Sequence, residues 1–325
     1  MASLMPLSNG RPYATASNNP MQLHHHLNSF GQYLRARHGR RVQKLALNVG
    51  FSCPNRDGSK GRGGCTFCNN ASFTPHARQA PSLSEQLSSG RAHMQQLGTT
   101  RYLAYFQAYT NTYADVETLD ELYRSALQHQ DIVGLAIGTR PDCVPDAVLD
   151  LLVRYQEQGY EVWLELGLQS AFDSTLRRVN RGHGYAEYLD AVRRARRRSI
   201  PLCTHLIVGL PGEQAEHSLC TINRVIDAGV DGLKLHPLHV VKGSQLANEW
   251  RRGEYQPMRF IEYVNLASEM IRRTPTDVLF HRVTATAQNQ LLLAPDWCAH
   301  KWPVMNAIGE NLARHGGQGH ARSSR

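Results

Sequence analysis

Three cysteines in a glycine-rich stretch have a spacing that suits metal chemistry. Cys53, Cys65 and Cys68 follow the pattern Cys-x11-Cys-x2-Cys. The glycines between the first two are Gly58, Gly61, Gly63 and Gly64. A loop so rich in glycine can wrap closely around an inorganic core and direct backbone N–H groups at its sulfur atoms. The stretch therefore predicts metal ligation or thiol redox chemistry.

The spacing alone leaves three kinds of site open. A [4Fe–4S] cluster can be held by three thiolates. Because its fourth iron then has no protein ligand, that iron can bind a substrate or cofactor. A structural zinc site would need a fourth ligand, and the next candidate is His76. A redox Cys-x-x-Cys pair would use Cys65 and Cys68 and leave Cys53 without a role.

The elements that must position these thiols are short apolar segments that alternate with longer amphipathic ones. The segments that we expect to be strands are 44–51, 102–108, 132–139, 162–169, 202–210 and 232–241, and a seventh, 278–284, would extend one edge. The segments that we expect to be helices are 83–97, 116–129, 146–158, 185–198, 213–228 and 258–273.

Six such alternations favour an α/β fold with a parallel sheet of right-handed βα units. Because a complete barrel needs eight units, we expect a partial (βα)6 TIM-like barrel whose site lies at the carboxyl ends of the strands. Residues 21–290 would form this core domain. Residues 1–20 would be a disordered lead, and 291–325 a C-terminal extension with a mobile tail.

The chain is basic, with a formal net charge of +9, and 31 of its 36 basic residues are arginines. Arginine suits phosphate groups, so an RNA or DNA partner is one interpretation, and solvated helix surfaces are the other. The densest run is Arg193, Arg194, Arg196, Arg197 and Arg198, with Arg177, Arg178 and Arg181 before it. No apolar segment is long enough for a bilayer and no signal peptide is evident, so we expect a cytoplasmic protein without a membrane partner.

Residues 44–73, KLALNVGFSCPNRDGSKGRGGCTFCNNASF, resemble the cluster loop of YhcC-like radical S-adenosylmethionine (SAM) proteins, which are related to the catalytic subunit of elongator. Further segments resemble the ends of strands two to five of that family and its sixth strand. They are YFQAYTNTYA (105–114), GTRPD (138–142), LELGLQS (164–170), HLIVGLPGE (205–213) and residues 233–246. The resemblance follows the same order as the strand and helix alternation.

This resemblance implies a radical SAM enzyme that binds a [4Fe–4S] cluster through Cys53, Cys65 and Cys68. The open iron of such a cluster binds the amino and carboxylate groups of SAM. One-electron reduction then cleaves SAM to a 5′-deoxyadenosyl radical, which abstracts hydrogen from an unactivated carbon. An electron donor such as flavodoxin or ferredoxin would supply the electron.

The resemblance also implies contacts to SAM near the cysteines and after the second strand. Phe67 would pack against the adenine, although an ordinary buried phenylalanine that supports the loop is the alternative. Gln107, Tyr109 and Thr110 would hydrogen-bond the amino group of SAM. The sequence lacks the acidic residue that many members have in this segment.

Further contacts are implied by the later strands. Glu165 and Gln169 share parity on one strand, so both can point into the barrel and contact the ribose or carboxylate of SAM. Arg140 would bind the carboxylate through its guanidinium, unless it forms a structural ion pair with Glu165. The residues expected along the adenine through backbone contact are Leu206, Val208 and Gly209.

The elongator relationship implies chemistry at the wobble uridine of tRNA. Too few residues follow position 290 to form the acetyltransferase domain of elongator, so we expect an existing modification to be altered. A radical SAM enzyme on a small metabolite or protein is the second interpretation, and a zinc-stabilised nucleic-acid binder the third. The remaining cysteines, Cys143, Cys203, Cys220 and Cys298, are expected to be buried packing thiols.

Overall fold

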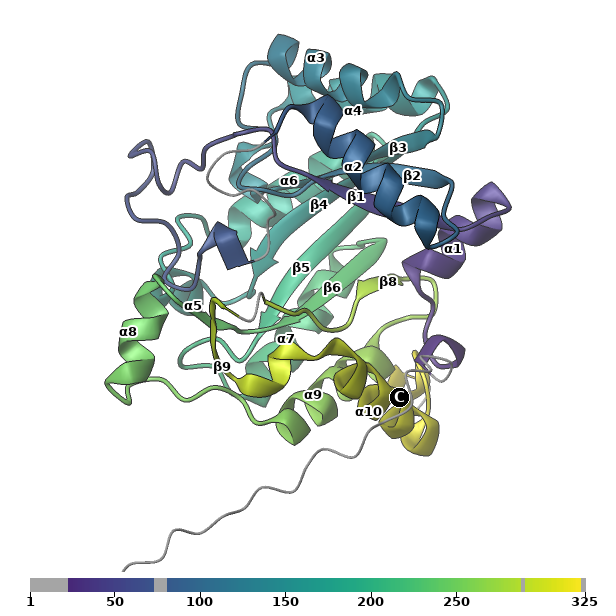
Figure 1. Ribbon diagram of the computed structural model, residues 1–325. Helices are drawn as coiled ribbons and strands as arrows, with labels where there is room; N and C mark the ends of the chain where they lie inside the picture. The colour runs from purple at the N-terminus through teal and green to yellow at the C-terminus, as the bar shows by residue number, and fades with distance from the viewer. Residues whose placement is uncertain (1–22, 73–80, 288–289, 323–325) are drawn as a thin grey trace, which may run out of the picture.

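The chain folds into an open barrel around one parallel sheet. A computed structural model describes residues 23–72, 81–287 and 290–322. The strands, in their order across the sheet, are β1 (Val42–Leu47), β2 (Arg101–Phe106), β3 (Ile132–Thr139), β4 (Glu161–Gln169), β5 (Leu202–Val208), β6 (Gly232–Pro237) and β8 (Leu279–Arg282). Every neighbouring pair is parallel, and the sheet curves with its helices on the outside (Figure 1).

The outer helices confirm the predicted alternation. They are α2 (Leu83–Gln96), α3 (Val116–Leu127), α4 (Asp146–Glu157), α6 (Tyr185–Arg197), α7 (Ala215–Asp227) and α9 (Phe260–Arg273). Each lies within two residues of its predicted bounds, because each carries an apolar stripe that packs on the sheet. The predicted fold class is confirmed, and the seventh segment forms β8 beside β6.

Several further elements were not expected. They are α1 (Phe30–His38), α5 (Asp173–Arg178), α8 (Gln245–Arg251), α10 (Lys301–His315), the antiparallel pair β7 (Val240–Val241) and β9 (Leu292–Ala294), and the 3-10 turns Leu23–His25, Asn70–Ser72, Pro141–Cys143, Asp296–Ala299 and His320–Arg322. The predicted strand 232–241 is two strands, β6 and β7. Pro237 ends the first, because proline has no N–H to continue the ladder.

Helix α1 closes the amino-terminal end of the barrel. Its Phe30 and Leu34 belong to a buried cluster with residues near the starts of the strands, including Leu103 and Trp163. The rings of Phe30 and Trp163 meet edge to face with centroids 5.0 Å apart. The interior is therefore sealed by apolar packing at this end, and a ligand must enter from the carboxyl ends of the strands.

The C-terminal segment of the described chain is held against the barrel. The side chain of Gln318 donates to the carbonyl of Val278 at 2.7 Å, and its backbone N–H donates to the carbonyl of His26 at 2.8 Å. Gln318, in the tail expected to be mobile, is thus hydrogen-bonded to the rest of the protein. The lead expected at 1–20 lies outside the described residues. Among the described helices, none has the length and apolarity to span a bilayer.

Gly134 on β3 provides a test of the sheet. A Cβ at this position would lie 1.9 Å from the backbone oxygen of Glu161 on β4. We expect Gly134→Ala to lower the free energy of unfolding by about 2–3 kcal/mol, because the two strands must separate to admit the methyl group. Gly31→Ala on α1 is the matched control, since no atom lies within 4 Å of its Cβ. Urea unfolding followed by circular dichroism measures both, and equal midpoints would contradict this account.

Candidate active site

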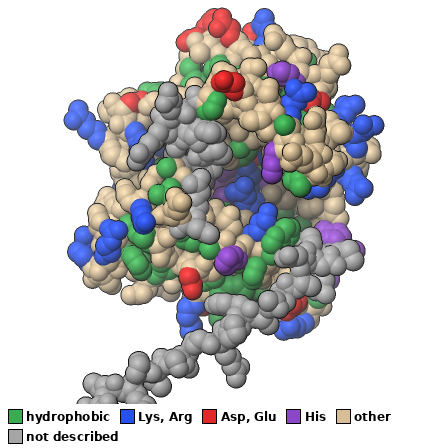
Figure 2. Space-filling model, in the orientation of Figure 1, with side chains coloured by type: hydrophobic (Ala, Val, Ile, Leu, Met, Phe, Trp, Pro, Cys, Tyr) green, Lys and Arg blue, Asp and Glu red, His purple; other side chains and the backbone are tan. Residues whose placement is uncertain are grey.

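A cavity of about 660 Å³ lies at the carboxyl ends of the strands. Its wall combines the cysteine loop with residues at the ends of the strands and the start of α10. Figure 2 shows a hollow in this face of the molecule, with Lys or Arg side chains inside it and His side chains beside it. This is the end of the barrel at which the sequence predicted the site.

The loop that follows β1 is folded by its own backbone and by contacts across the barrel. Gly64 donates its N–H to the carbonyl of Asn55 at 2.8 Å, and Thr66 donates to that of Val179 at 3.0 Å. Gly63 and Gly64 have φ values of 80° and 81°, in the left-handed region that favours glycine. The loop therefore needs glycine at this turn to bring its last two cysteines back toward the cavity.

The thiols of Cys53, Cys65 and Cys68 all line this cavity, and none of them forms a disulfide. Burial, together with the neighbouring thiol of Cys65, raises the pKa of Cys68 to about 11, and Cys53 adds to the effect. Three thiolates this close together repel one another. A cationic core is therefore needed to keep all three ionised at neutral pH.

The number of ligands bears on which metal these cysteines could hold. A structural zinc site is closed by four ligands, and the three thiols are one short of that number. Three thiolates suit a [4Fe–4S] cluster that keeps one iron open. His76, the candidate fourth zinc ligand, lies outside the described residues.

Two arginines lie beside the thiols. Arg181 is buried, and its Nη1 lies 3.6 Å from the sulfur of Cys65 while its Nη2 donates to the carbonyl of Gly167 at 2.5 Å. Arg56 donates to the carbonyl of Cys68 at 3.0 Å. The positive charges stabilise thiolates at these positions. The sequence analysis did not identify Arg181 as a site residue, because 116 residues separate it from Cys65.

Six of the predicted SAM contacts lie on the cavity wall: Phe67, Gln107, Tyr109, Thr110, Arg140 and Gln169. The backbones of Tyr109 and Gln169 have φ values of 61° and 79°, which residues other than glycine rarely adopt. The hydroxyl of Thr110 is buried and has no hydrogen-bond partner in the described part of the chain. These features suit a ligand-binding wall, and the individual contacts stay predictions.

Arg140 is already engaged by the protein. Its Nε and Nη2 each donate to Asp142 at 2.9 Å, and its Nη1 donates to the carbonyl of Arg181 at 2.8 Å. Its alternative partner, Glu165, is paired with lysines instead. Binding of a carboxylate by Arg140 would therefore have to compete with Asp142.

The predicted backbone contacts on β5 and after it lie beside the cavity wall. The side chains of Leu206 and Val208 are buried in the outer core, and Ile207 between them faces the cavity. Gly209 has a φ of 91° and accepts a hydrogen bond from the hydroxyl of Tyr255 at 2.8 Å. Burial of these side chains does not bear on a contact made by the backbone, so the predicted contacts with the adenine stay predictions.

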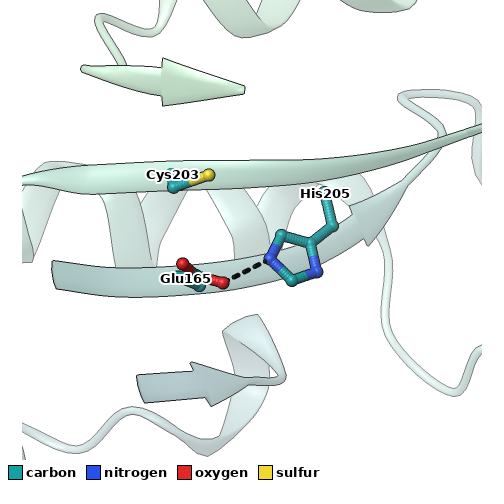
Figure 3. Close-up of side chains that lie close together, drawn as sticks. All are labelled: Glu165, Cys203 and His205. Atoms are coloured by element: carbon teal, nitrogen blue, oxygen red, sulfur yellow. Dashed lines mark hydrogen bonds and ion pairs between the residues drawn. The ribbon is translucent and has the colours of Figure 1, made fainter. Parts of the chain in front are cut away.

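Glu165 lies below the cavity wall. Its side chain points into the barrel and is fully buried, and it is not among the residues that line the cavity, so its contact with SAM stays a prediction. It forms ion pairs with Lys44 of β1 and Lys234 of β6. It also lies 2.9 Å from Nε2 of His205 on β5 (Figure 3). The sequence did not predict these contacts, because the spacing of residues along the chain does not distinguish a lysine inside the barrel from an exposed one.

Burial and charge together shift the pKa values in this buried cluster. Burial opposes ionisation of Glu165, but Lys234 and Lys44 outweigh it and hold the pKa of the carboxyl well below its usual range. Burial lowers the pKa of Lys234 to about 7 and that of His205 to about 4. Glu165 is therefore ionised and His205 neutral at neutral pH. Lys234 also donates to the hydroxyl of Tyr105, which lines the cavity, at 2.8 Å.

Glu165, Cys203 and His205 lie close enough to hold a metal ion (Figure 3). Two ammonium groups already neutralise the carboxylate, and their charges would repel a cation. Burial also raises the pKa of Cys203 far above that of an ordinary thiol. The group is therefore better explained as an ion cluster of the barrel interior than as a metal site.

The arginine run at the end of α6 is mostly paired within the molecule. Arg194 bonds Asp190 at 2.7 Å, and Arg198 bonds Asp150 at 2.7 Å. Upstream, Arg178 bonds Glu249 at 2.6 Å. These pairs favour the interpretation of solvated helix ends over a surface that follows a phosphate backbone.

The remaining cysteines divide by exposure. Cys143, Cys203 and Cys298 are buried, as expected for packing thiols. Cys220 is exposed on α7, so that expectation is wrong for it. It faces solvent because it lies off the apolar stripe by which α7 packs on the sheet.

Comparison with known families gives two matches. Residues 48–223 match the Radical SAM superfamily, and residues 230–314 match the Radical_SAM C-terminal domain. The first match spans the cysteine loop and β2 to β5, and the second spans β6, β8 and α10. The cavity wall is thus built by both matched regions.

Individual relatives extend this result. Protein YhcC of Escherichia coli (strain K12) is 54% identical over 303 residues, which are 93% of this chain and 97% of that protein. The tRNA uridine(34) acetyltransferase of Dehalococcoides mccartyi is 31% identical over 159 residues, 48% of this chain and 34% of that protein. The archaeal Elp3 structure from Methanocaldococcus infernus has a TM-score of 0.65 at 18% identity, over 87% of this chain and 67% of that one, and so shares the fold.

Removal of the buried carboxylate tests the ion cluster. We expect Glu165→Gln to lower the free energy of unfolding at pH 7 by about 3 kcal/mol, because two ammonium groups lose their counter-charge. The pKa of Glu165 is lowered in the folded state, so its contribution is present above the usual carboxyl value of 4.5 and is lost as the pH falls through the folded value. Urea titrations at pH 7 measure the effect of the substitution, and titrations at successively lower pH below 4.5 should show the difference between the two chains narrowing.

The control for this measurement is Glu121→Gln on the exposed surface of α3. It removes the same charge from a solvated position and should change stability by no more than about 0.5 kcal/mol. Equal effects of the two substitutions at pH 7 would refute the role assigned to Glu165.

Proposed function

The chain belongs to the radical SAM superfamily, and from this premise we propose that Cys53, Cys65 and Cys68 hold its cluster in the cavity with SAM beside it. Enzymes of this superfamily use a [4Fe–4S] cluster and SAM. The observation that carries the assignment is the presence of all three thiols on one cavity wall at the carboxyl ends of the strands. When bound, the cofactors supply reductive cleavage of SAM and hydrogen abstraction from an unactivated carbon.

The chain's own residues would keep the thiolates ionised and in place. Arg181 and Arg56 provide positive charge beside Cys65 and Cys68. The left-handed turn at Gly63 and Gly64 lets the backbone pass close to the site. An electron from a donor such as flavodoxin or ferredoxin would enter on this side, where Arg56 and the loop around it are exposed.

Other residues on the wall of the same cavity would bind SAM. Phe67 is half-buried and lines the cavity, so its ring can pack against the adenine. The hydroxyl of Thr110 offers a hydrogen bond that no described residue uses. Gln107, Tyr109 and Gln169 present polar groups on the same wall. Apolar packing of α1 beneath the cavity excludes water from the barrel side.

We propose that the substrate is tRNA and that the reaction alters an existing substituent at C5 of the wobble uridine. The match to tRNA uridine(34) acetyltransferase, over about half of this chain, supports this choice. The formal net charge of +9 also suits a nucleic acid partner.

A small metabolite or protein substrate is the second candidate. The pairing of Arg194, Arg198 and Arg178 with acidic neighbours favours it, because these arginines are engaged within the molecule. Such an enzyme would cleave SAM without any response to RNA.

The ligand assignment is tested by Cys65→Ala. We expect this substitution to remove the broad iron–sulfur absorbance and to lower 5′-deoxyadenosine formation at least about a hundredfold, because three ligands are the minimum for an open-iron cluster. Iron and sulfide content measured after anaerobic reconstitution gives a readout that does not depend on turnover.

Cys220→Ala is the matched control, because this cysteine is exposed on α7 outside the cavity. It should leave iron content and SAM cleavage close to those of the unmodified chain. If both substitutions lowered iron content and SAM cleavage equally, the assignment of Cys65 as a ligand and of Cys220 as a residue without a role in the cluster would be wrong.

The substrate class is tested by anaerobic SAM cleavage with and without tRNA from a strain that lacks the protein. We expect tRNA to increase 5′-deoxyadenosine formation and its wobble uridine to change in mass, as measured by nucleoside mass spectrometry. If tRNA did not change the rate of SAM cleavage, and the wobble uridines of that strain were unchanged, tRNA would be rejected as the substrate. A small metabolite or protein would then be the remaining candidate.

A further inference from the structure

The cavity wall is strongly cationic. Among the described residues that line it, none is an aspartate or glutamate. The basic side chains on the wall are Arg56, Arg140, Arg181, Arg282 and Lys301, with the imidazoles of His205, His236, His239 and His281. A wall with this composition attracts anions and disfavours cations, and the effect is stronger in a recess than on open surface.

These cations differ in what they already bind. Arg56, Arg140 and Arg181 are tied to the cysteine loop, to Asp142 and to backbone carbonyls. The side chain of Arg282 makes no hydrogen bond or ion pair with the residues that the structure describes. The same holds for the side chain of Lys301, whose ammonium lies 4.8 Å from the centroid of the Trp302 ring. Arg282 and Lys301 are therefore available to a ligand.

Arg282 and Lys301 come from one part of the fold, away from the cysteine loop. Arg282 is the last residue of β8, where it pairs in register with Lys234 of β6, and Lys301 begins α10. Both residues are exposed and line the cavity. Their elements lie in the region matched to the Radical_SAM C-terminal domain, whereas the three thiols lie in the other matched region.

Two histidines beside Arg282 complete this part of the wall. Burial, with the charge of Arg282, lowers the pKa of His236 well below its usual range, and burial lowers that of His239 to about 4. Both rings are neutral at neutral pH and so can donate or accept one hydrogen bond without adding charge. The Nε2 atom of His239 is buried without a hydrogen-bond partner in the described chain.

We propose that Arg282 and Lys301, with His239 beside them, bind an oxyanion of the substrate, either a phosphate or a carboxylate group. The guanidinium of Arg282 can hold two oxygen atoms of such a group at once, and Lys301 adds a point charge. This site rests on the proposed function, in which the cluster and SAM occupy the cysteine side of the same cavity. It assigns to the C-terminal region the selection of an anionic substrate.

Binding of two small probes tests the site directly. Inorganic phosphate and acetate are titrated separately, by calorimetry at low salt, into the full chain loaded anaerobically with cluster and SAM. We expect one of them to saturate a single site and Arg282→Gln to weaken it about tenfold, as loss of a charge-assisted pair of hydrogen bonds predicts. The preferred probe identifies the source of the oxyanion.

Lys301→Gln provides a second variant and should weaken the same probe by a smaller factor. Arg197→Gln on α6 removes an equal charge from an exposed position outside the cavity and should not change binding. Absence of saturable binding, or equal binding by Arg282→Gln and Arg197→Gln, would overturn the site.

SAM cleavage by the same preparations separates this proposal from the function on which it rests. Arg197→Gln should form 5′-deoxyadenosine in the absence of substrate at the rate of the unmodified chain, and Arg282→Gln should bind SAM with unchanged affinity. If it loses SAM binding, Arg282 contacts the cofactor and the substrate site is refuted. If the unmodified chain itself cannot cleave SAM, the proposed function fails, and the probe titrations still decide whether the oxyanion site exists.

Discussion

The barrel interior depends on one buried carboxylate. Glu165 is the counter-charge that Lys44 and Lys234 share inside the sheet, and it joins β4 to β1, β5 and β6 through their side chains. Above this layer lie Tyr105 and His205, which the cluster orients and which form part of the cavity wall. The position of the active site therefore depends on charge balance one layer below it.

The cavity has two chemically distinct sides that come from different parts of the chain. The side made by the cysteine loop has its cations engaged by thiols, carbonyls and Asp142. The side made by β6, β8 and α10 has Arg282 and Lys301, whose side chains form no hydrogen bond or ion pair with the described residues, although Lys301 lies over the ring of Trp302. In a fold where all strand ends meet at one edge, such a division lets cofactor and substrate be held by separate segments.

The sequence predicted the alternating elements well, because each outer helix has an apolar stripe and each inner strand a continuous apolar run. Three cysteines and six further residues that the sequence indicated as site residues lie together at one end of the barrel. The sequence failed for contacts that depend on residues distant in the chain. The partners of Glu165 are 121 and 69 residues away, and Arg181 lies 116 residues from Cys65. No local pattern marks such pairs, since the same residue types are common on surfaces.

The cysteine loop is fastened to segments that are synthesised much later. Thr66 bonds the backbone of Val179 through its N–H and that of Leu246 through its carbonyl, and Asn55 donates to the carbonyl of Asn180. The three cysteines consequently acquire this arrangement only after most of the polypeptide has left the ribosome. Under the proposed ligand assignment, the cluster would be inserted into a nearly finished scaffold rather than into a nascent segment.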